Sequence, residues 1–582
     1  MRIAIIERDK CTHKKCGYRC VSVCPGVRMG DETVKVGDDG YPIIDETLCT
    51  GCGICPKKCP SKCIRIINIA EEKGSPVFQY GSNAFRLYGL PLPQEGVVGL
   101  IGKNGIGKTT AIRLLSGSIT PNFGEYKRKW KIAEALGRMG VEAKAYFSKL
   151  AEKKVRVSYK PQNVNLLQGA FKGNVGGLLK KMDERNAIDE AVRIFELEES
   201  LGKKMGELSG GELQRAAIAA AWLKDADIYY FDEPASYLDI AQRLKMGRAL
   251  KELSERKNVI VVEHDLAIFD YLSDYIYVLY GEENAYGILS GLKNARAGIN
   301  EYLQGYLREE NVRFRNNAIT FEQTALTERK SPPKVSFSPM KKDLPGFSFE
   351  SEEGEIKEGE IMGIVGKNAI GKTLFIKMLA GVEKPDEGEG GIGLKLSYKP
   401  QYIRAEGGIV SELFSSSKMD GAVLEEAKRI LSMGPLMERE VKHLSGGELQ
   451  RVAITLALSR NADIYLFDEP SAFLDVEQRM HFASLLKRII ENSDKAAFVV
   501  DHDVVLIDAI SNRLMVFDGV PSVHGKANKA ESKRDGMNRF LRSVGITMRR
   551  DKDTLRPRIN KPDSALDREQ KEKGEHFYYV KD

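Results

Sequence analysis

Three absences narrow the class of this 582-residue sequence. No apolar run approaches the roughly 18–20 residues that a membrane-spanning helix requires. The first residues, MRIAIIERDKC, lack the long apolar core that marks a secretory signal. No cysteine occurs after Cys63, which argues against disulfides scattered through a secreted fold. We therefore expect a soluble, cytoplasmic protein that makes no membrane contact.

Positive charge is unevenly distributed along the chain. Residues 127–154 hold nine Lys and Arg against three Asp and Glu, and residues 520–561 hold twelve against four. A local excess of this kind suggests a polyanionic partner, although an ordinary solvated surface would account for either stretch alone. The length is too great for one hydrophobic core and predicts roughly three or four domains.

A long internal repeat organises most of the chain. The octapeptide LSGGELQR occurs at 208–215 and again at 444–451, which chance does not explain. Four further pairs, one identical and three closely similar, occur in the same order in both copies: GKNGIGKT (102–109) and GKNAIGKT (366–373), YKPQ (159–162 and 398–401), IYYFDEP (228–234) and IYLFDEP (464–470), VVEHD (261–265) and FVVDHD (498–503). The sequence therefore predicts two copies of one α/β nucleotide-binding domain.

The glycine-rich segment of each copy predicts a phosphate loop. In GxxxxGKT the glycines let backbone N–H groups close around phosphates at the start of a helix, whose dipole favours anions. An apolar strand precedes each loop, as the motif requires. Ala369 stands where the first copy has Gly105, and its Cβ is expected to restrict the turn and weaken ATP binding. The residues assigned to ATP here are Gly102, Asn104, Gly105, Gly107, Lys108, Thr109, Thr110, Gly366, Asn368, Gly371, Lys372 and Thr373.

The apolar runs IYYFD and IYLFD predict buried parallel strands that end in carboxylates. Asp232 and Asp468 would hold Mg²⁺ together with the hydroxyls of Thr109 and Thr373, and the glutamate that follows each can orient or deprotonate the attacking water. A single histidine is usually structural, but histidines at matched positions in both copies favour contact with the γ-phosphate. The catalytic candidates are Glu233, Glu469, His264, His502, Gln162 and Gln401.

The cysteines form two motifs, C-x4-C-x3-C-x3-C-P and C-x2-C-x2-C-x3-C-P. The second is the bacterial ferredoxin run, in which the fourth cysteine ligates the other cluster of a pair, so we predict two 4Fe–4S clusters in an α+β ferredoxin-like domain. Zinc is the alternative, because C-x2-C pairs also bind it. Cys63 is a ninth cysteine, interpreted as a packing residue. The predicted ligands are Cys11, Cys16, Cys20 and Cys59 for one cluster, and Cys49, Cys52, Cys55 and Cys24 for the other.

Two features lie outside the ATPase motifs. The first copy has 25 more residues between its phosphate loop and YKPQ than the second, and they fall in 127–154, where apolar spacing predicts a basic helix–loop–helix hairpin. The segment 298–315 is echoed at 536–550. We interpret this pair as hinge elements that set how the two copies face each other. Unstructured basic linkers are the alternative.

The motif set of both copies resembles the ATP-binding-cassette (ABC) ATPases. Each LSGGE predicts a serine-capped helix N-terminus with free N–H groups. The resemblance implies that this segment of one cassette closes on the γ-phosphate held by the other, with two ATP molecules between head-to-tail cassettes. Ser445, Gly446 and Gly447 would then complete the site of Lys108, and Ser209, Gly210 and Gly211 that of Lys372. The candidates for adenine stacking are Phe85, Tyr88 and Phe347.

Across nearly its whole length, including the tail at 556–574, the chain resembles the ABC-E ribosome-recycling ATPases, or RNase L inhibitor family, and its compact form suggests an archaeal member. The resemblance implies a monomer that splits ribosomes into subunits with a release factor or Pelota-like protein bound. Hairpin and hinges would touch small-subunit RNA and protein, and cassette closure would move the iron–sulfur domain. The expected units are 1–75 (iron–sulfur), 76–290 (first cassette), 291–340 (hinge), 341–520 (second cassette) and 521–582 (C-terminal hinge).

Three other classes of protein share some of these motifs. A transporter ATPase gives no role to the ferredoxin unit or the hairpin. A structural-maintenance or repair ATPase needs a long heptad insertion between the phosphate loop and FDE, and only 125 residues separate Lys108 from Glu233. An ATP-gated iron–sulfur electron-transfer protein is the alternative that stays open, because the clusters could carry electrons.

Overall fold

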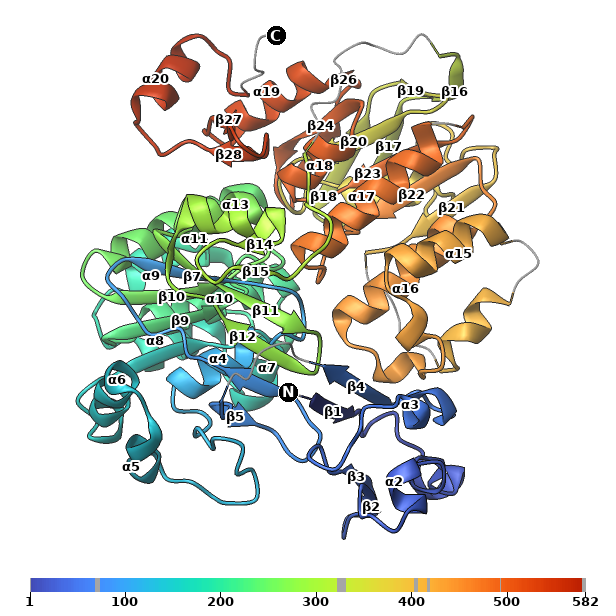
Figure 1. The fold of residues 1–582 in the computed structure, drawn as a ribbon. Helices are drawn as coiled ribbons and strands as arrows, with labels where there is room; N and C mark the ends of the chain where they lie inside the picture. The colour runs from blue at the N-terminus through green and yellow to red at the C-terminus, as the bar shows by residue number, and fades with distance from the viewer. Residues whose placement is uncertain are drawn as a thin grey trace.

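The structure is a computed structural model that describes residues 2–68, 74–321, 331–401, 407–415, 419–491 and 493–577. Two similar α/β domains lie side by side, and a small N-terminal domain lies beneath their junction in the view of Figure 1. The C-terminal segment returns to lie over the first α/β domain. Within the described residues, no helix has both the length and the apolar character needed to cross a bilayer.

The N-terminal domain is built on very short elements. Strand β1 (Arg2–Ile6) pairs antiparallel with β4 (Ile64–Asn68), and β2 (Val34–Val36) with β3 (Pro42–Ile44). Its helices are α1 (Arg19–Ser22), α2 (Pro25–Arg28) and α3 (Ile54–Lys58). Cysteines make up about half of its buried apolar core. A core this small and this rich in cysteine buries little aliphatic surface, which fits a domain stabilised by bound inorganic groups.

The first cassette, the α/β domain nearer the N-terminus, is a sheet with a parallel centre. The strand order is β5-β6-β12-β11-β7-β10-β9-β8, in which β11, β7, β10, β9 and β8 are parallel neighbours. The central strands are fully buried because helices cover both faces. The strands are β5 (Phe78–Gln79), β6 (Arg86–Tyr88), β7 (Val97–Ile101), β8 (Val157–Lys160), β9 (Ile228–Asp232), β10 (Asn258–Val262), β11 (Tyr275–Glu282) and β12 (Tyr286–Leu289), and the main helices are α4 (Lys108–Leu115), α8 (Val175–Met182), α9 (Ile188–Ile194), α10 (Gly210–Trp222), α11 (Ile240–Ser254) and α12 (Leu266–Leu272).

The second cassette repeats this topology strand for strand, in the order β17-β18-β25-β24-β20-β23-β22-β21. The expected fold class, twin α/β ATPase domains behind a small α+β domain, is confirmed. Its strands are β17 (Met340–Leu344), β18 (Phe347–Ser351), β20 (Ile361–Val365), β21 (Leu396–Lys399), β22 (Ile464–Asp468), β23 (Ala496–Val500), β24 (Arg513–Val520) and β25 (His524–Ala527), and its helices are α14 (Lys372–Leu379), α15 (Gly421–Ile430), α16 (Gly446–Ser459), α17 (Val476–Glu491) and α18 (Val504–Ile510).

The basic insertion folds as two short helices on the first cassette. It contains α5 (Ile132–Ala135), a 3₁₀ turn (Leu136–Arg138) and α6 (Val141–Ala151). Phe147 is fully buried, and the Tyr146 hydroxyl lies 2.6 Å from the Leu115 carbonyl oxygen and 2.7 Å from the Tyr230 hydroxyl. These contacts anchor the outer helix, and they leave the basic side chains at Lys127, Arg128, Lys129 and Lys131 exposed.

A helix and a small antiparallel hairpin follow each cassette. Helix α13 (Ala295–Gln304) precedes β14 (Tyr306–Leu307) and β15 (Val312–Arg313). Helix α19 (Lys533–Ser543) precedes β27 (Met548–Arg550) and β28 (Pro557–Ile559), after which α20 (Ala565–Glu572) ends the described chain. Residues 322–330 of the expected first hinge lie outside the described residues. Because each segment folds as a helix followed by a hairpin, the sequence similarity between 298–315 and 536–550 reflects a shared helix–hairpin unit.

Buried ion pairs tie the C-terminal unit to the first cassette. Arg556 is fully buried with its guanidinium 3.3 Å from the Asp270 carboxylate, and Arg558 reaches the same carboxylate at 2.6 Å. Arg296 pairs with Asp551 at 3.1 Å. Arg556 and Arg558, two of the cations in 520–561, are therefore paired inside the fold. A cation paired inside the fold is not available to a polyanionic partner, so the expectation of such a partner stays a prediction for the remaining cations of the stretch.

Candidate functional site

Both phosphate loops wrap around a buried lysine. Lys108 begins α4, and its Nζ lies 2.8 Å from the Gly102 carbonyl oxygen and 2.7 Å from that of Lys103. Burial lowers the pKa of Lys108, against the opposing effect of nearby carboxylates. Gly105 and Gly107 have φ of +68° and +100°, a conformation that glycine adopts without strain. Lys372 is held in the same way by the Gly366 and Lys367 carbonyls.

The one substituted loop position keeps the loop conformation. Ala369 has φ of +56°, close to the +68° of Gly105. A left-handed backbone costs a non-glycine residue roughly 1–2 kcal/mol, so the second loop carries local strain that the first does not.

Each predicted catalytic glutamate is fixed by two side chains from separate motifs. Glu233 Oε1 accepts a hydrogen bond from Gln162 Nε2 at 2.7 Å, and His264 Nε2 lies 3.4 Å away. Burial alone would raise the pKa of Glu233, but the hydrogen bond and charge of His264, with Lys108 and Gln162, lower it to about 2. The carboxylate is therefore ionised and oriented, as a group that positions water must be.

The second copy repeats this arrangement. Gln401 Nε2 donates to Glu469 Oε1 at 2.7 Å, and His502 Nε2 lies 3.5 Å from it. The pKa of Glu469 is likewise lowered to about 2, because the hydrogen bonds and charges of its neighbours outweigh burial. Glu233 and Glu469 have φ of +47° and +46°. Shared backbone strain at matched positions is typical of functional sites.

The two aspartates at the strand ends are suited to a divalent cation. Asp232 and Asp468 are fully buried, and neither oxygen of either carboxylate has a hydrogen-bond partner among the described residues. Burial and the adjacent glutamate raise the pKa of Asp232 to about 7 and that of Asp468 to about 6. A buried, unpaired carboxylate is costly unless a cation compensates it. These oxygens therefore fit Mg²⁺, with the hydroxyls of Thr109 and Thr373 beside them.

Several supporting residues were missed in the sequence. Lys160 of YKPQ is buried, and its Nζ donates to the carbonyl oxygens of Asp232 and Glu233 at 2.9 and 3.3 Å. Gln214, the seventh letter of the octapeptide, donates to the carbonyls of Glu233 and Pro234, both at 2.8 Å. Lys399 and Gln450 do the same in the second copy. Their recurrence in both repeats was the available signal.

The cassettes contact each other reciprocally through their phosphate loops. Asn104 N donates to Asp475 Oδ2 at 2.9 Å, and Asn104 Nδ2 to the Phe473 carbonyl at 3.1 Å. Asn368 makes the matching bonds to Asp239 Oδ2 at 2.8 Å and to the Tyr237 carbonyl at 3.2 Å. The acceptors lie just after FDEP in each repeat, in SYLD and AFLD, and sequence reasoning passed over them. The arrangement is head to tail.

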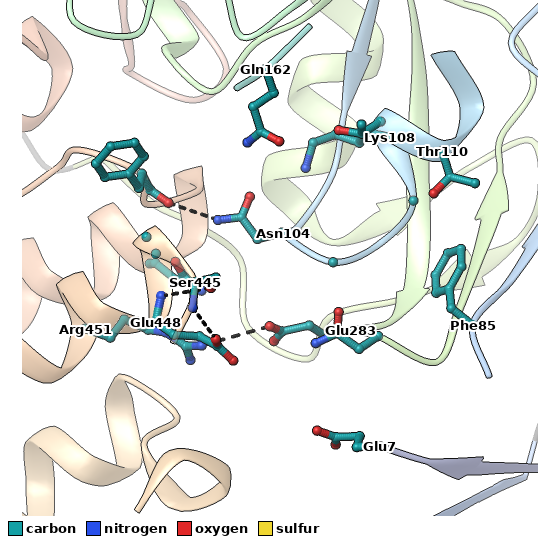
Figure 2. A pocket seen from close by; sticks show the side chains of 18 of the residues that line it. Glu7, Phe85, Asn104, Lys108, Thr110, Gln162, Glu283, Ser445, Glu448 and Arg451 are labelled. Atoms are coloured by element: carbon teal, nitrogen blue, oxygen red, sulfur yellow. Dashed lines mark hydrogen bonds and ion pairs between the residues drawn. The ribbon is translucent and has the colours of Figure 1, made fainter. Parts of the chain in front are cut away.

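A pocket of about 590 Å³ at this junction holds both halves of one expected site. Figure 2 shows Lys108 and Thr110 on one side and Ser445 and Glu448 on the other. Its lining also includes Asn104, Gly105, Gly107, Thr109, Gln162, Glu233, Gly446 and Gly447. The sequence-predicted residues of the first phosphate loop and the second LSGGE are therefore brought together.

The residues predicted to stack on adenine differ in whether they line this pocket. Phe85 lines this pocket, and so does Tyr80, which was not predicted and whose hydroxyl lies 3.1 Å from Thr110 Oγ1. Tyr88 is 5% exposed and does not line the pocket. Its side chain lies on the face of β6 that packs into the core. Phe347 packs near Gly525 in the second cassette, as Phe85 packs near Gly287 in the first.

The N-terminal domain also reaches this pocket. Glu7 and Asp9 line it, and Asp9 lies 3.4 Å from the Arg439 guanidinium of the second cassette. Arg439 also pairs with Glu448 of the octapeptide helix. From the other side, Arg65 Nη2 donates to the Glu283 carbonyl of the first cassette at 2.8 Å. One pocket is thus bordered by all three domains.

The cysteines divide between two cavities as the ferredoxin pattern predicts. Cys11, Cys16, Cys20 and Cys59 line one, and Cys24, Cys49, Cys52 and Cys55 line the other. Each cavity thus takes its fourth cysteine from the opposite motif. No three His, Cys, Asp or Glu side chains of the described residues converge closely enough to hold a single ion. Sulfurs spread around a cavity suit a cluster better than one tetrahedral zinc, which draws its ligands to one point.

Burial raises the pKa of Cys20 to about 11 and of Cys55 to about 12. Neighbouring cysteines add to both shifts. Iron binds cysteine as the thiolate, so binding of a cluster would compensate the cost of ionising these two buried thiols. The donor set therefore fits an iron–sulfur group.

Known families match the three domains. The ABC transporter family matches residues 88–236 and 350–472, and a possible Fer4-like domain in RNase L inhibitor matches residues 1–32. An uncharacterized ABC transporter ATP-binding protein of Methanocaldococcus jannaschii is 50% identical over 99% of this chain and 98% of its own. ABC transporter E family member 1 of Arabidopsis thaliana is 42% identical over the same shares.

The chain belongs to the ABC transporter E family.

Solved structures of this family agree with the fold. A model of ribosome-bound archaeal Pelota and ABCE1 matches with a TM-score of 0.91 and 50% identity, and covers 100% of this chain and 99% of its own. A complex of archaeal ribosomal stalk protein aP1 with the archaeal ribosome recycling factor aABCE1 matches with a TM-score of 0.82 and 50% identity, over 88% of this chain and all of its own. As an ABC transporter E family member, the chain is an ATPase with an iron–sulfur domain.

Proposed function

We propose that this chain is an ATP-driven ribosome recycling factor that splits ribosomes into subunits after termination or rescue. Relatives over nearly the full length include translation initiation factor RLI1 of Saccharomyces cerevisiae, 42% identical, besides the two archaeal structures named for a stalk protein and for Pelota. The observation that carries the proposal is the shared pocket. ATP bound there would touch both cassettes next to the N-terminal domain, so ATP binding or hydrolysis can move that domain.

The geometry of each site supports the following division of roles in hydrolysis. The phosphate loop and its lysine bind the β- and γ-phosphates, and Asp232 or Asp468 with its threonine would hold Mg²⁺, which neutralises charge on the phosphates when bound. Glu233 or Glu469 orients the attacking water, and the paired histidine and glutamine hold that carboxylate. The serine and glycines at the start of α16 or α10 present backbone N–H groups to the γ-phosphate.

Coupling to the N-terminal domain runs through named ion pairs. Arg439 contacts both Glu448, which caps α16, and Asp9 of the N-terminal domain. On the first cassette, Arg65 of the N-terminal domain holds the Glu283 backbone while the Glu283 carboxylate lies 3.9 Å from Arg451 of α16. Any rotation of α16 toward ATP therefore changes the contacts of both edges of the N-terminal domain.

The proposal includes two 4Fe–4S clusters, held by the two cysteine sets described above, and the division into units at residues 75, 290, 340 and 520. It also includes a monomer whose cassettes pair within one chain, and a cytoplasmic site of action. The exposed cations of the hairpin at 127–154 would contact small-subunit RNA and protein, while a release factor or Pelota-like protein would meet the N-terminal domain.

The test is sedimentation of purified archaeal ribosomes with this protein, ATP and a Pelota-like or release factor. We expect free subunits only when all components are present, and none with the Glu233→Gln, Glu469→Gln double variant. Intact ribosomes in every lane, together with a cluster reduction potential that changes on ATP binding, would favour the electron-transfer alternative instead.

A further inference from the structure

The first cysteine cavity is lined by five cysteines, one more than a 4Fe–4S cluster uses. Besides the four predicted ligands it includes Cys63. The Cys63 side chain is 1% exposed, and its Sγ lies 3.5 Å from Cys59 Sγ. The two sulfurs are therefore in contact at the same edge of the cavity.

The local backbone brings these two residues together. Cys59 directly follows the last residue of α3, and the N–H of Lys62 donates to the Cys59 carbonyl at 3.2 Å. Lys62 has φ of +47°, so the chain makes a tight turn before β4 begins. A cysteine that only packs has no need to point at a ligand sulfur inside a cavity of thiols. Its place beside Cys59 offers the same corner of the cavity a second thiol.

We propose that Cys63 is a reserve ligand for the first cluster site, able to take the iron position of Cys59. The inference rests on the proposed two-cluster assignment and deepens it. The exchange would need no oxidant or reductant: the Cys63 proton would pass to the neighbouring Cys59 sulfur, so that Cys63 would hold the iron as a thiolate and Cys59 would leave it as a thiol. The set Cys11, Cys16, Cys20 and Cys63 would then hold the site.

The second cavity supplies a matched control within the same chain. Its fourth predicted ligand, Cys24, comes from the opposite cysteine motif, just as Cys59 does in the first cavity. The residue four positions after Cys24 is Arg28, where Cys59 has Cys63. All nine cysteines are described, and no fifth one lines the second cavity. Loss of Cys24 should therefore find no replacement thiol.

The experiment measures iron and acid-labile sulfide per chain in anaerobically purified full-length variants. We expect about eight of each in the wild type and in Cys63→Ala, and about eight in Cys59→Ala because Cys63 replaces the missing ligand. We expect about four in Cys24→Ala and about four in the Cys59→Ala, Cys63→Ala double variant. Visible absorbance should follow the same order.

The decisive comparison is between Cys59→Ala and the double variant. A value near four in Cys59→Ala beside eight in the wild type would overturn the reserve role and leave the two-cluster proposal standing. A value near eight in the double variant would also overturn it, because the cluster would then survive without either thiol. Zinc without sulfide in the wild type would overturn both the cluster assignment and the inference.

Discussion

The phosphate loops differ at one position, Gly105 in the first and Ala369 in the second, and adding a methyl group to the first tests what this difference does. Gly105→Ala should impair the first ATP site, although alanine is natural at the matching position of the second. A Cβ on Gly105 would lie 2.6 Å from Asn284 Oδ1 and 2.9 Å from Glu283 Cγ. In the second cassette, Ser522 N donates to the Ala369 carbonyl at 2.8 Å, as Asn284 N donates to that of Gly105 at 3.0 Å. The shorter serine leaves room for the methyl.

The expected magnitude combines two costs. A left-handed backbone costs alanine roughly 1–2 kcal/mol relative to glycine, and the contact with Asn284 forces a further shift of about 1 kcal/mol. If the loop relaxes to escape them, ATP binding must restore its conformation, so affinity falls by the same factor. About 2 kcal/mol corresponds to a ~30-fold weaker Kd.

The assay is calorimetric titration of ATP in a Lys372→Ala background, which silences the second site. Gly105→Ala should weaken binding about 30-fold, and adding Asn284→Ser should recover about fivefold, because it relieves the contact but not the cost of the left-handed backbone. An affinity within twofold of the parent, or no recovery in the double variant, would refute the steric reasoning.

Three further predictions follow from the described contacts. Glu233→Gln with Glu469→Gln should bind ATP but lower turnover by about 10²–10⁴-fold, measured by phosphate release; wild-type turnover would reject their role. The pKa of Asp232 is about 7 in the folded protein against 3.8 in the unfolded chain, so the stability of the protein without Mg²⁺ should fall as pH rises from about 4 to 7. Asp232→Asn should remove that fall, which is worth at most about 4 kcal/mol near neutral pH. Thermal unfolding without Mg²⁺ measures it, and an unchanged pH profile in the variant would contradict the prediction. Deleting 127–154 should preserve basal ATPase activity and reduce the slope of log K for ribosome binding against log salt by about 0.7–0.9 for each phosphate that the hairpin neutralises; unchanged affinity at several salt concentrations would contradict an RNA contact.

The cassettes were predictable because their chemistry repeats. Two copies of each motif removed the ambiguity of a single match, and the strand that ends in Asp232 and the helix that begins after Ser209 lie where the periodicity and the cap signals placed them. The cysteine spacing also indicated which cysteines line each of two cavities, because the fourth cysteine crosses over in this motif. Their role as cluster ligands stays a prediction.

Contacts between distant segments were not predictable. Nothing local marks Asp475 as a partner of Asn104, since 371 residues separate them. The cations of 520–561 looked available from composition alone, whereas Arg556 is fully buried against Asp270. Composition counts charges without their partners, and the partners here lie on another domain. Tyr80 was missed for a similar reason, because only the fold brings it to Thr110.

Joining both cassettes in one polypeptide has a consequence for how the sites can diverge. In a pair of identical subunits, every substitution appears at both interfaces at once. Here Asn104 meets Asp475 while Asn368 meets Asp239, so each interface is encoded by its own residues and can change without the other. Ala369 already differs from Gly105 in this way. Selection can thus change the residues of one ATP site while those of the other stay the same, which a dimer of identical subunits does not allow.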